Sequence, residues 1–266
     1  MSTDHGTSER VLAPAVARAS AVLDLLARTG RPASLAELAK TLRLPKSSLH
    51  GLCATLEHLN LITRLEGGQM ALGPHVMMWA NAFMARLDIT QEFFASWDDM
   101  RVLPEETITL SVRDGAEVVY IACRNGKHPL GLRFHAGMRL PAVYTATGLA
   151  MLSTLPDASV RKLLDGHPGG WPAPLTDHGL RDTASVIDEL RQIRQRRYST
   201  DREGVRDGMY CYGAPVFDSH HPEAVAGVAV SIRSLEANPA LEERAGHAIR
   251  KLADRLSERL GAWRGR

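Results

Sequence analysis

Four polar side chains gather at the start of one predicted helix, where they are suited to contact a polyanion. The stretch PKSSLH places Lys46, Ser47, Ser48 and His50 within the first two turns. Lysine and serine at a helix N-terminus suit phosphate oxygens, because unpaired backbone N–H groups and the helix dipole favour negative charge there. A recognition helix presents its reading side chains at this end. Because any exposed helix has a polar outer face, the cluster alone leaves DNA binding and an ordinary solvated helix equally open.

The segments before this cluster follow the order of a helix-turn-helix. Apolar spacing predicts a helix over residues 14–29. Ser34 and Glu37 form the pattern of a capping box, which begins a short second helix. A turn over residues 42–44 leads to a third helix that begins at Pro45. Four of its apolar residues follow the spacing of a buried face: Leu49, Leu52, Cys53 and Leu56.

A small hairpin follows the three helices. Residues 61–65 and 70–72 are predicted strands, and Glu66-Gly67-Gly68-Gln69 is the turn between them. Arg64 on this hairpin is placed to reach the minor groove or the DNA backbone. Three helices and a hairpin in this order are more specific than any single residue. They favour a winged helix-turn-helix over a helical hairpin that merely packs in a core.

Composition and charge bound the remaining classes of function. The chain has 266 residues with 44% hydrophobic and 23% charged residues, which is typical of a globular protein with substantial cores. Its net charge of +2 neither proves nor excludes nucleic-acid binding. Three cysteines indicate a reducing compartment. The absence of a secretory signal and of a long apolar run predicts a cytoplasmic protein with no membrane contact.

The larger, C-terminal part changes to strand periodicity. Helices are predicted first over residues 74–87 and 90–103, and the wide apolar stripe of residues 74–87 favours packing against its twin in a second chain. Residues 107–113 and 117–123 then form a hairpin around Asp114-Gly115. Further strands are predicted at 130–134, 211–217 and 225–232, and further helices at 146–154, 158–165, 183–197 and 239–263. This mixture indicates an α+β domain whose sheet is covered by helices on one face.

Cys211 is the residue with the widest range of chemistry. A catalytic thiolate needs a nearby histidine base, and no recognisable motif supplies one, so no catalytic residue is assigned. A small apolar group in a buried strand and a pocket-lining thiol both stay open. The histidines at 167, 178, 220 and 221 match no metal-ligand spacing, so neither a metal nor a cofactor is expected.

The stretch RLPAVYTATGLAML carries a candidate anion site. The chain leaves an extended Leu140-Pro141 and enters a helix at Thr145, which suits the N-cap position. The N–H groups of Ala146, Thr147 and Gly148 then lack intrahelical partners and are expected to cradle a carboxylate. Four residues are candidates for an apolar wall or for ordinary core: Leu130, Leu132, Met138 and Tyr144.

Several stretches resemble the isocitrate lyase regulator (IclR) family of bacterial transcription factors. The first is RASAVLDLLARTGRPASLAELAKTLRLPKSSLHGLCATLEHLNLI, and GPHVMMWANAFMARLDI resembles that family's linker helix. The likeness continues through ETITLSVRDGAEVVYIA, GMRLPAVYTATGLAML and YSTDREGVRDGMYCYGAPVFD. The motifs stand in the family's order over nearly the whole chain.

The resemblance implies a winged helix-turn-helix over residues 10–73, a linker and dimerisation helix over 74–89, and a GAF-like effector-binding domain over 90–266. It implies operator DNA and a small organic acid as ligands, and a homodimer or a dimer of dimers. The backbone amides of Ala146 and Thr147 match positions that grip an effector carboxylate. Asp201, Cys211 and Ser231 match further pocket positions, although Asp201 also suits a solvated loop and Ser231 a pairing within the sheet.

Three residues depart from the family pattern, and one of them, Leu149 in place of a frequent lysine, is expected to cost little. Gly51 stands where an arginine is usual, which predicts weaker DNA affinity and predicts that Gly51→Arg tightens binding. Ala229 stands where some relatives carry a second serine, which favours a less polar effector such as an aromatic carboxylate. Two alternatives stay open: an enzyme that uses Cys211 and associates through its N-terminal helices, and a sensor whose DNA-reading helix no longer functions.

Overall fold

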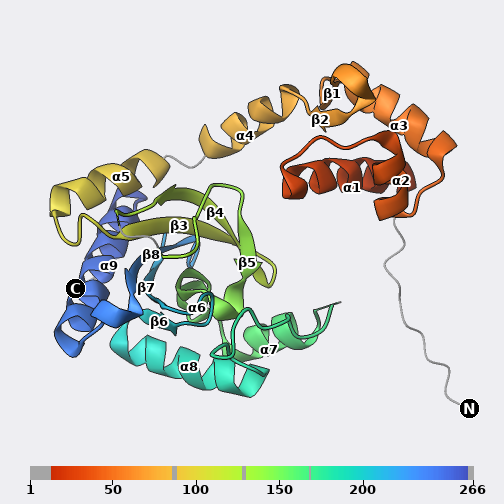
Figure 1. Cartoon of the computed structure of the whole chain (residues 1–266). Coiled ribbons are helices and arrows are strands. Elements are labelled where there is room, and N and C mark those ends of the chain that lie inside the picture. Colours follow the sequence, from red (N-terminus) through yellow and green to blue (C-terminus); the bar gives the residue numbers. More distant parts are fainter. Residues whose placement is uncertain (1–12, 86–88, 128–129, 168, 263–266) are drawn as a thin grey trace, which may run out of the picture. The chain divides into compact units, whose positions relative to one another are not determined.

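The chain forms two compact units in a computed structural model that describes residues 13–85, 89–127, 130–167 and 169–262. The units comprise residues 1–86 and 87–266 (Figure 1). No helix in the described ranges is long and apolar enough to cross a membrane. The predicted α+β class with an N-terminal winged helix-turn-helix is confirmed.

The N-terminal unit consists of helices around a two-stranded hairpin. Its elements are α1 (Pro14–Thr29), α2 (Leu35–Leu42), α3 (Lys46–His58), β1 (Ile62–Arg64), β2 (Met70–Leu72) and α4 (His75–Ala85). The predicted capping box is present, because the Ser34 hydroxyl accepts from the Glu37 N–H and the Glu37 carboxylate accepts from the Ser34 N–H at 2.8 Å. A core of buried residues from α1, α2, α3 and the hairpin fixes the orientation of α3.

The C-terminal unit is built around one antiparallel sheet. Its helices are α5 (Ile89–Met100), α6 (Ala146–Leu152), α7 (Asp157–Asp165), α8 (Thr183–Arg196) and α9 (Pro239–Arg259). Its strands are β3 (Thr107–Asp114), β4 (Glu117–Arg124), β5 (Arg139–Pro141), β6 (Ser199–Arg202), β7 (Met209–Val216) and β8 (Ala226–Arg233). Within the described residues the strands lie in the order β5-β4-β3-β8-β7-β6.

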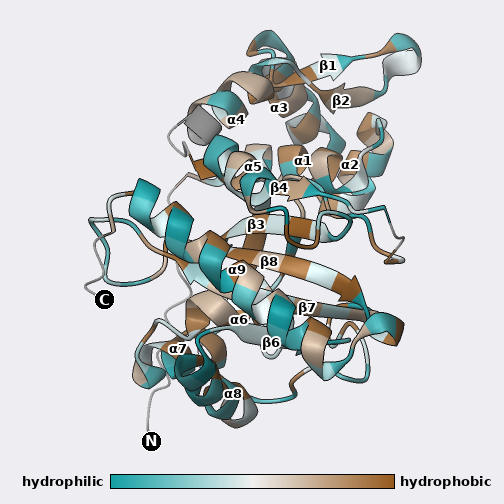
Figure 2. Cartoon of the chain, turned by 90° about the vertical axis from the view of Figure 1, so that its left-hand side faces the viewer, coloured by the Kyte–Doolittle hydropathy of each residue, from teal (hydrophilic) through white to brown (hydrophobic). Residues whose placement is uncertain are grey.

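Helices cover both faces of this sheet, so the prediction of a single covered face was wrong. The helix α6 packs on β7, β8 and β3, whereas α9 packs on β7 and β8 from the other side. The helix α5 packs against α9. In Figure 1 the sheet curls around α6, and α9 lies outside the curl. Figure 2 shows hydrophobic residues along β3 and β8 behind α9, whose outward side is hydrophilic. The hydroxyl residues that alternate along β3 are therefore buried instead of solvated.

The predicted strand over residues 130–134 was also wrong. The Asn125 side chain pairs with the Phe134 backbone in both directions, at 2.9 and 3.0 Å, and takes the place of a neighbouring strand. Gly131 in the left-handed region, with φ of 71°, also interrupts an extended run. The edge strands β5 and β6 were not predicted.

Candidate functional sites

The four predicted DNA-contacting side chains of α3 are all exposed. Lys46, Ser47, Ser48 and His50 lie outside the N-terminal core, while Leu49, Cys53 and Leu56 of the same helix are buried in it. The helix begins at Lys46 with Pro45 as its N-cap, so these polar groups occupy the first two turns. Gly51 is exposed as well, and a Cβ atom built there meets no atom within 4 Å. A longer side chain at this position therefore fits without a clash.

Arg64 is partly engaged by α3 itself. Its guanidinium lies on β1 and forms an ion pair with Glu57 of α3 at 3.1 Å. Both side chains are partly exposed, so the pair is worth about 1 kcal/mol or less. An approaching phosphate would compete with Glu57 for this guanidinium.

Three polar residues far apart in sequence form one row across the C-terminal sheet. Asp201 on β6 pairs in register with Cys211 on β7, and Cys211 pairs with Ser231 on β8. The Cys211 Sγ lies 3.1 Å from the Ser231 Oγ in a buried contact. Because residues opposite one another in register point to the same face, the sheet itself brings the three side chains together.

The helix α6 lies directly over this row. Ala146 and Thr147 are its first two residues, where N–H groups have no acceptor within the helix. The expectation for Gly148 was wrong, because its N–H donates to the Thr145 Oγ1 at 3.0 Å. A Cβ atom on Gly213 would stand 2.6 Å from the Ala146 carbonyl oxygen, so glycine there allows α6 to approach β7.

All five predicted effector-binding residues line a single buried cavity of about 10 Å³, which is room for one water molecule. They are Ala146, Thr147, Asp201, Cys211 and Ser231. The same cavity is lined by Thr145, the predicted N-cap, and by Ala229, which stands where some relatives carry a second serine. Four further lining residues were not predicted, namely Thr109, Tyr120, Phe134 and Val205. Of the four residues considered for an apolar wall, none lines it. Leu130 and Tyr144 are buried in the core cluster, and Leu132 and Met138 pack against that cluster.

Burial sets the protonation of the cavity's titratable groups. It raises the pKa of Asp201 to about 7, although the Gly204 N–H donates to the Asp201 Oδ1 at 2.7 Å and favours the carboxylate. Burial also raises the pKa of the Cys211 thiol well above its usual value, and nearby Asp201 adds to this effect. The pKa of the Tyr120 hydroxyl is raised for the same main reason. A neutral thiol and a carboxyl that titrates near neutrality therefore face this space.

Two polar atoms at the cavity are buried without a hydrogen-bond partner of normal geometry. They are the Thr147 Oγ1 and the Asp201 Oδ2. An unpaired buried polar atom costs about 1–3 kcal/mol, so a bound molecule that supplies a partner gains that amount. The cavity is thus prepared for a polar group.

The cavity does not provide nucleophilic chemistry. No histidine is among its lining residues, and the raised thiol pKa of Cys211 disfavours the reactive thiolate. Across the part of the chain that the structure describes, no three His, Cys, Asp or Glu side chains cluster as a metal site would require.

Comparison with known proteins gives matches to two family models. Residues 15–66 match the IclR helix-turn-helix domain, and residues 81–258 match the C-terminal domain of the bacterial transcriptional regulator IclR. The chain is 28% identical over 217 residues to the HTH-type transcriptional regulator XynR of Escherichia coli, covering 81% of this chain and 84% of that protein.

Solved structures agree with this match. The repressor BlcR of Agobacterium tumefaciens is 40% identical, with a TM-score of 0.60 over 94% of this chain and 97% of that one. An IclR homologue from Microbacterium hydrocarbonoxydans, crystallised in complex with 4-hydroxybenzoate, is 15% identical. It has a TM-score of 0.77 over 92% of this chain and 99% of that one, a likeness of fold.

Proposed function

Because the chain belongs to the IclR family of bacterial transcriptional regulators, we propose that it binds operator DNA through α3 and senses a small organic acid in the buried cavity. The observation that carries the proposal is the cavity, where residues from α6 and five strands surround two unpartnered polar atoms. The relatives are named as regulators and not as enzymes. The repressor named at 40% identity favours repression as the direction of control.

The effector is best matched by an aromatic carboxylate. Its carboxylate would accept from the N–H groups of Ala146 and Thr147 and from the Thr147 hydroxyl. Tyr120 and Phe134 would contact its ring, since their rings lie 5.1 Å apart on one wall of the cavity. A protonated Asp201 would donate to an effector oxygen, with Cys211 and Ser231 nearby. The homologue in complex with 4-hydroxybenzoate supports an aromatic acid as the class of effector, because a protein of this fold binds such an acid.

Dimerisation is assigned to α4. Met77, Met78 and Trp79 are each at least half exposed on this helix, a density of apolar surface that water disfavours. Leu87, the last residue of the predicted stripe, lies outside the described residues, and the side chains of residues 83–85 are likewise not described. Two DNA-binding domains about 34 Å apart match successive turns of DNA, whereas a single domain contacts only one turn. We therefore assign residues 10–73 to DNA reading, 74–89 to joining two chains and 90–266 to sensing.

DNA contacts are assigned to Lys46, Ser47, Ser48 and His50, with Arg64 reaching the backbone once it leaves Glu57. The exposed N-terminal half of α3 supports this assignment. Position 51 lies on the same exposed side with open space around it, so an arginine there would add one charge-assisted contact. Such a contact is worth about 1–3 kcal/mol.

Fluorescence anisotropy on the duplex upstream of the protein's own gene tests DNA reading. At two salt concentrations, the upstream duplex should be bound more tightly than a scrambled duplex. Lys46→Ala should weaken binding to both duplexes and lower the salt dependence. Lys251→Ala on α9 removes the same charge outside the reading head and should change neither.

The same assay separates the remaining alternatives. Equal, weak binding of both duplexes would count against a sequence-reading regulator. If Gly51→Arg restored preferential binding to the upstream duplex, the result would instead identify a DNA-binding domain weakened at one position. Aromatic acids should change operator affinity, and Thr147→Val should abolish that response while leaving DNA binding intact. A response to small dicarboxylates or oxoacids with none to aromatic acids would overturn the effector class.

A further inference from the structure

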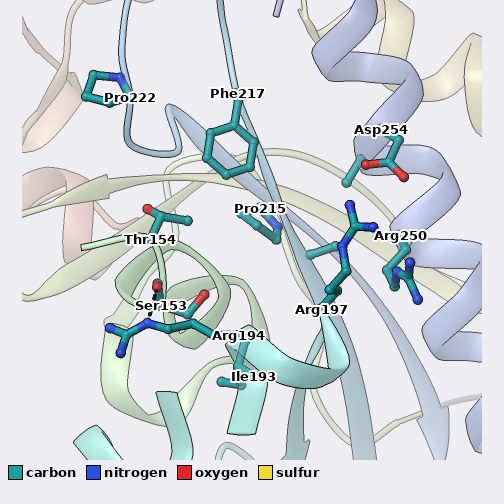
Figure 3. Close-up of a pocket in the computed structure, with 12 residues that line it drawn as sticks. Ser153, Thr154, Ile193, Arg194, Arg197, Pro215, Phe217, Pro222, Arg250 and Asp254 are labelled. Atoms are coloured by element: carbon teal, nitrogen blue, oxygen red, sulfur yellow. Dashed lines mark hydrogen bonds between the residues drawn. The ribbon is translucent and has the colours of Figure 1, made fainter. Parts of the chain in front are cut away.

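A second pocket of about 270 Å³ lies in the C-terminal unit and shares no lining residue with the effector cavity. It is bounded by the ends of α6 and α8, the end of β7 and one side of α9 (Figure 3). It has no part in the proposed binding of the effector. Its size suits a ligand smaller than a typical drug molecule, since such sites span roughly 300–1,000 Å³.

The pocket exists because β6 is short. Ser199–Arg202 pairs with Tyr210–Gly213 of β7, and β7 then continues through Ala214–Val216 with no β6 residue beside it. Pro215 has no N–H to offer a further strand, so this edge is protected against strand addition. This unpaired edge of β7 forms an apolar floor of the pocket, to which Ile193 of α8 and Phe217 contribute.

Three arginines surround this floor, and one of them is structural. Arg194 donates to the Ser153 and Leu155 carbonyl oxygens, both at 2.8 Å, and to Asp157 at 2.7 Å. Its charge is compensated and its donors are occupied. Arg194 therefore forms a wall of the pocket and does not serve as a ligand-binding group.

Arg197 and Arg250 differ from Arg194. Neither guanidinium makes a hydrogen bond or an ion pair with any residue that the structure describes. The backbone N–H of Arg197 ends α8 by donating to the Ile193 carbonyl oxygen at 2.7 Å, with φ of 65°. Figure 3 shows the Arg197 side chain directed into the pocket from this turn, with Arg250 and Asp254 on the α9 side.

The charges at the pocket leave an excess of one positive charge. Arg197 and Arg250 contribute two, Asp254 removes one, and Arg194 is balanced by Asp157. A guanidinium binds carboxylate oxygens through two parallel donors, and Phe217 offers a ring to a flat apolar body. We infer that this pocket is a second ligand site, which binds an aromatic monocarboxylate between Arg197 and Arg250 over the apolar floor.

Titration of the full chain with 4-fluorobenzoate, followed by ¹⁹F NMR, tests the site. The double variant R197Q/R250Q should weaken one class of binding at least tenfold. The matched variant R161Q/R244Q removes two exposed arginines whose side chains make no hydrogen bond or ion pair within the described residues, and it should bind as the parent chain does. Acetate lacks the ring, so it should compete with 4-fluorobenzoate for this site at least tenfold more weakly than benzoate does.

The outcomes separate this site from the effector cavity. Thr147→Val should leave the arginine-dependent class intact, whatever it does to operator release. Arg250 lies half-buried within α9, away from the Arg197 turn. If R250Q alone leaves every class of binding unchanged, the site is refuted without reliance on that turn. Absence of saturable binding by the parent chain, or equal losses in both double variants, would refute it as well.

Discussion

Replacing Asp201 should remove a large pH dependence from the stability of the C-terminal unit. Its side chain is buried, with 5% of the residue exposed, and this raises its pKa to about 7 from a value near 3.8. A carboxyl whose pKa is raised by folding is favoured in its protonated form. The contribution of Asp201 to the free energy of unfolding is therefore fully present below about pH 4 and is lost as the pH rises through about 7.

The magnitude follows from the difference between the two pKa values. About three pKa units at roughly 1.4 kcal/mol per unit amount to about 4 kcal/mol over the whole range. Roughly 2–3 kcal/mol of this falls between pH 5 and pH 8, because part of the loss is complete below pH 5. Asp201→Asn keeps the shape of the side chain and removes the titration, so its stability should lack this component.

Urea unfolding between pH 5 and pH 8 measures this effect. Trp97 of α5 is buried in the same unit and reports its unfolding by fluorescence. The free energy of unfolding of the parent chain, relative to that of Asp201→Asn, should fall by about 2–3 kcal/mol over this range. Asp207→Asn removes an exposed carboxylate in the following loop, and its free energy of unfolding should depend on pH as that of the parent chain does. Parallel curves for the parent and Asp201→Asn would refute the assignment of a neutral, desolvated carboxyl.

Three further predictions concern local structure. Ser34→Ala removes the capping box of α2 and should lower the unfolding free energy of the N-terminal unit by about 1 kcal/mol in thermal unfolding, whereas a loss below 0.3 kcal/mol would contradict the cap. Gly51→Ala, in open space within a helix, should raise that free energy by up to about 1 kcal/mol. Gly148→Ala should destabilise the C-terminal unit instead, because its Cβ atom would stand 2.2 Å from the Ala142 carbonyl oxygen; equal effects of the two glycine changes on melting would refute this contrast. In thiol labelling with a disulfide reagent, half-buried Cys123 should react before buried Cys211, which should react only as the unit unfolds; prompt labelling of Cys211 in the native chain would refute its burial.

The N-terminal unit could be predicted almost completely because its signals are local. The capping box at Ser34, the apolar spacing of α3 and the glycine turn after β1 each act within a few residues. The edge strands β5 and β6 could not be predicted in this way. Their short sequences, RLP and STDR, show no strand periodicity and are defined by pairing with β4 and β7.

The cavity was predicted in part, by resemblance and not by pattern. Family motifs led to five of its lining residues, whereas Thr109, Tyr120 and Phe134 were missed. Thr109 belongs to an alternating run that is typical of a solvent-facing strand, yet it pairs with Ala229 and lines the cavity under α6. Only the pairing of β3 with β8, which are more than a hundred residues apart in sequence, places it there. A single sequence contains no signal for that pairing.

The size of the cavity constrains how sensing can work. About 10 Å³ admits one water molecule, so any organic acid must displace side chains on entry. Those of α6 and the central strands are fixed by the packing of the sheet, whereas Phe134 and Val205 belong to loops. Phe134 is held by two hydrogen bonds to one side chain, Asn125, which can be broken without disrupting a strand. Under the proposed function, an effector would therefore favour an arrangement of these loops that differs from the closed one. It would change operator affinity only to the extent that the DNA-bound protein distinguishes the two arrangements.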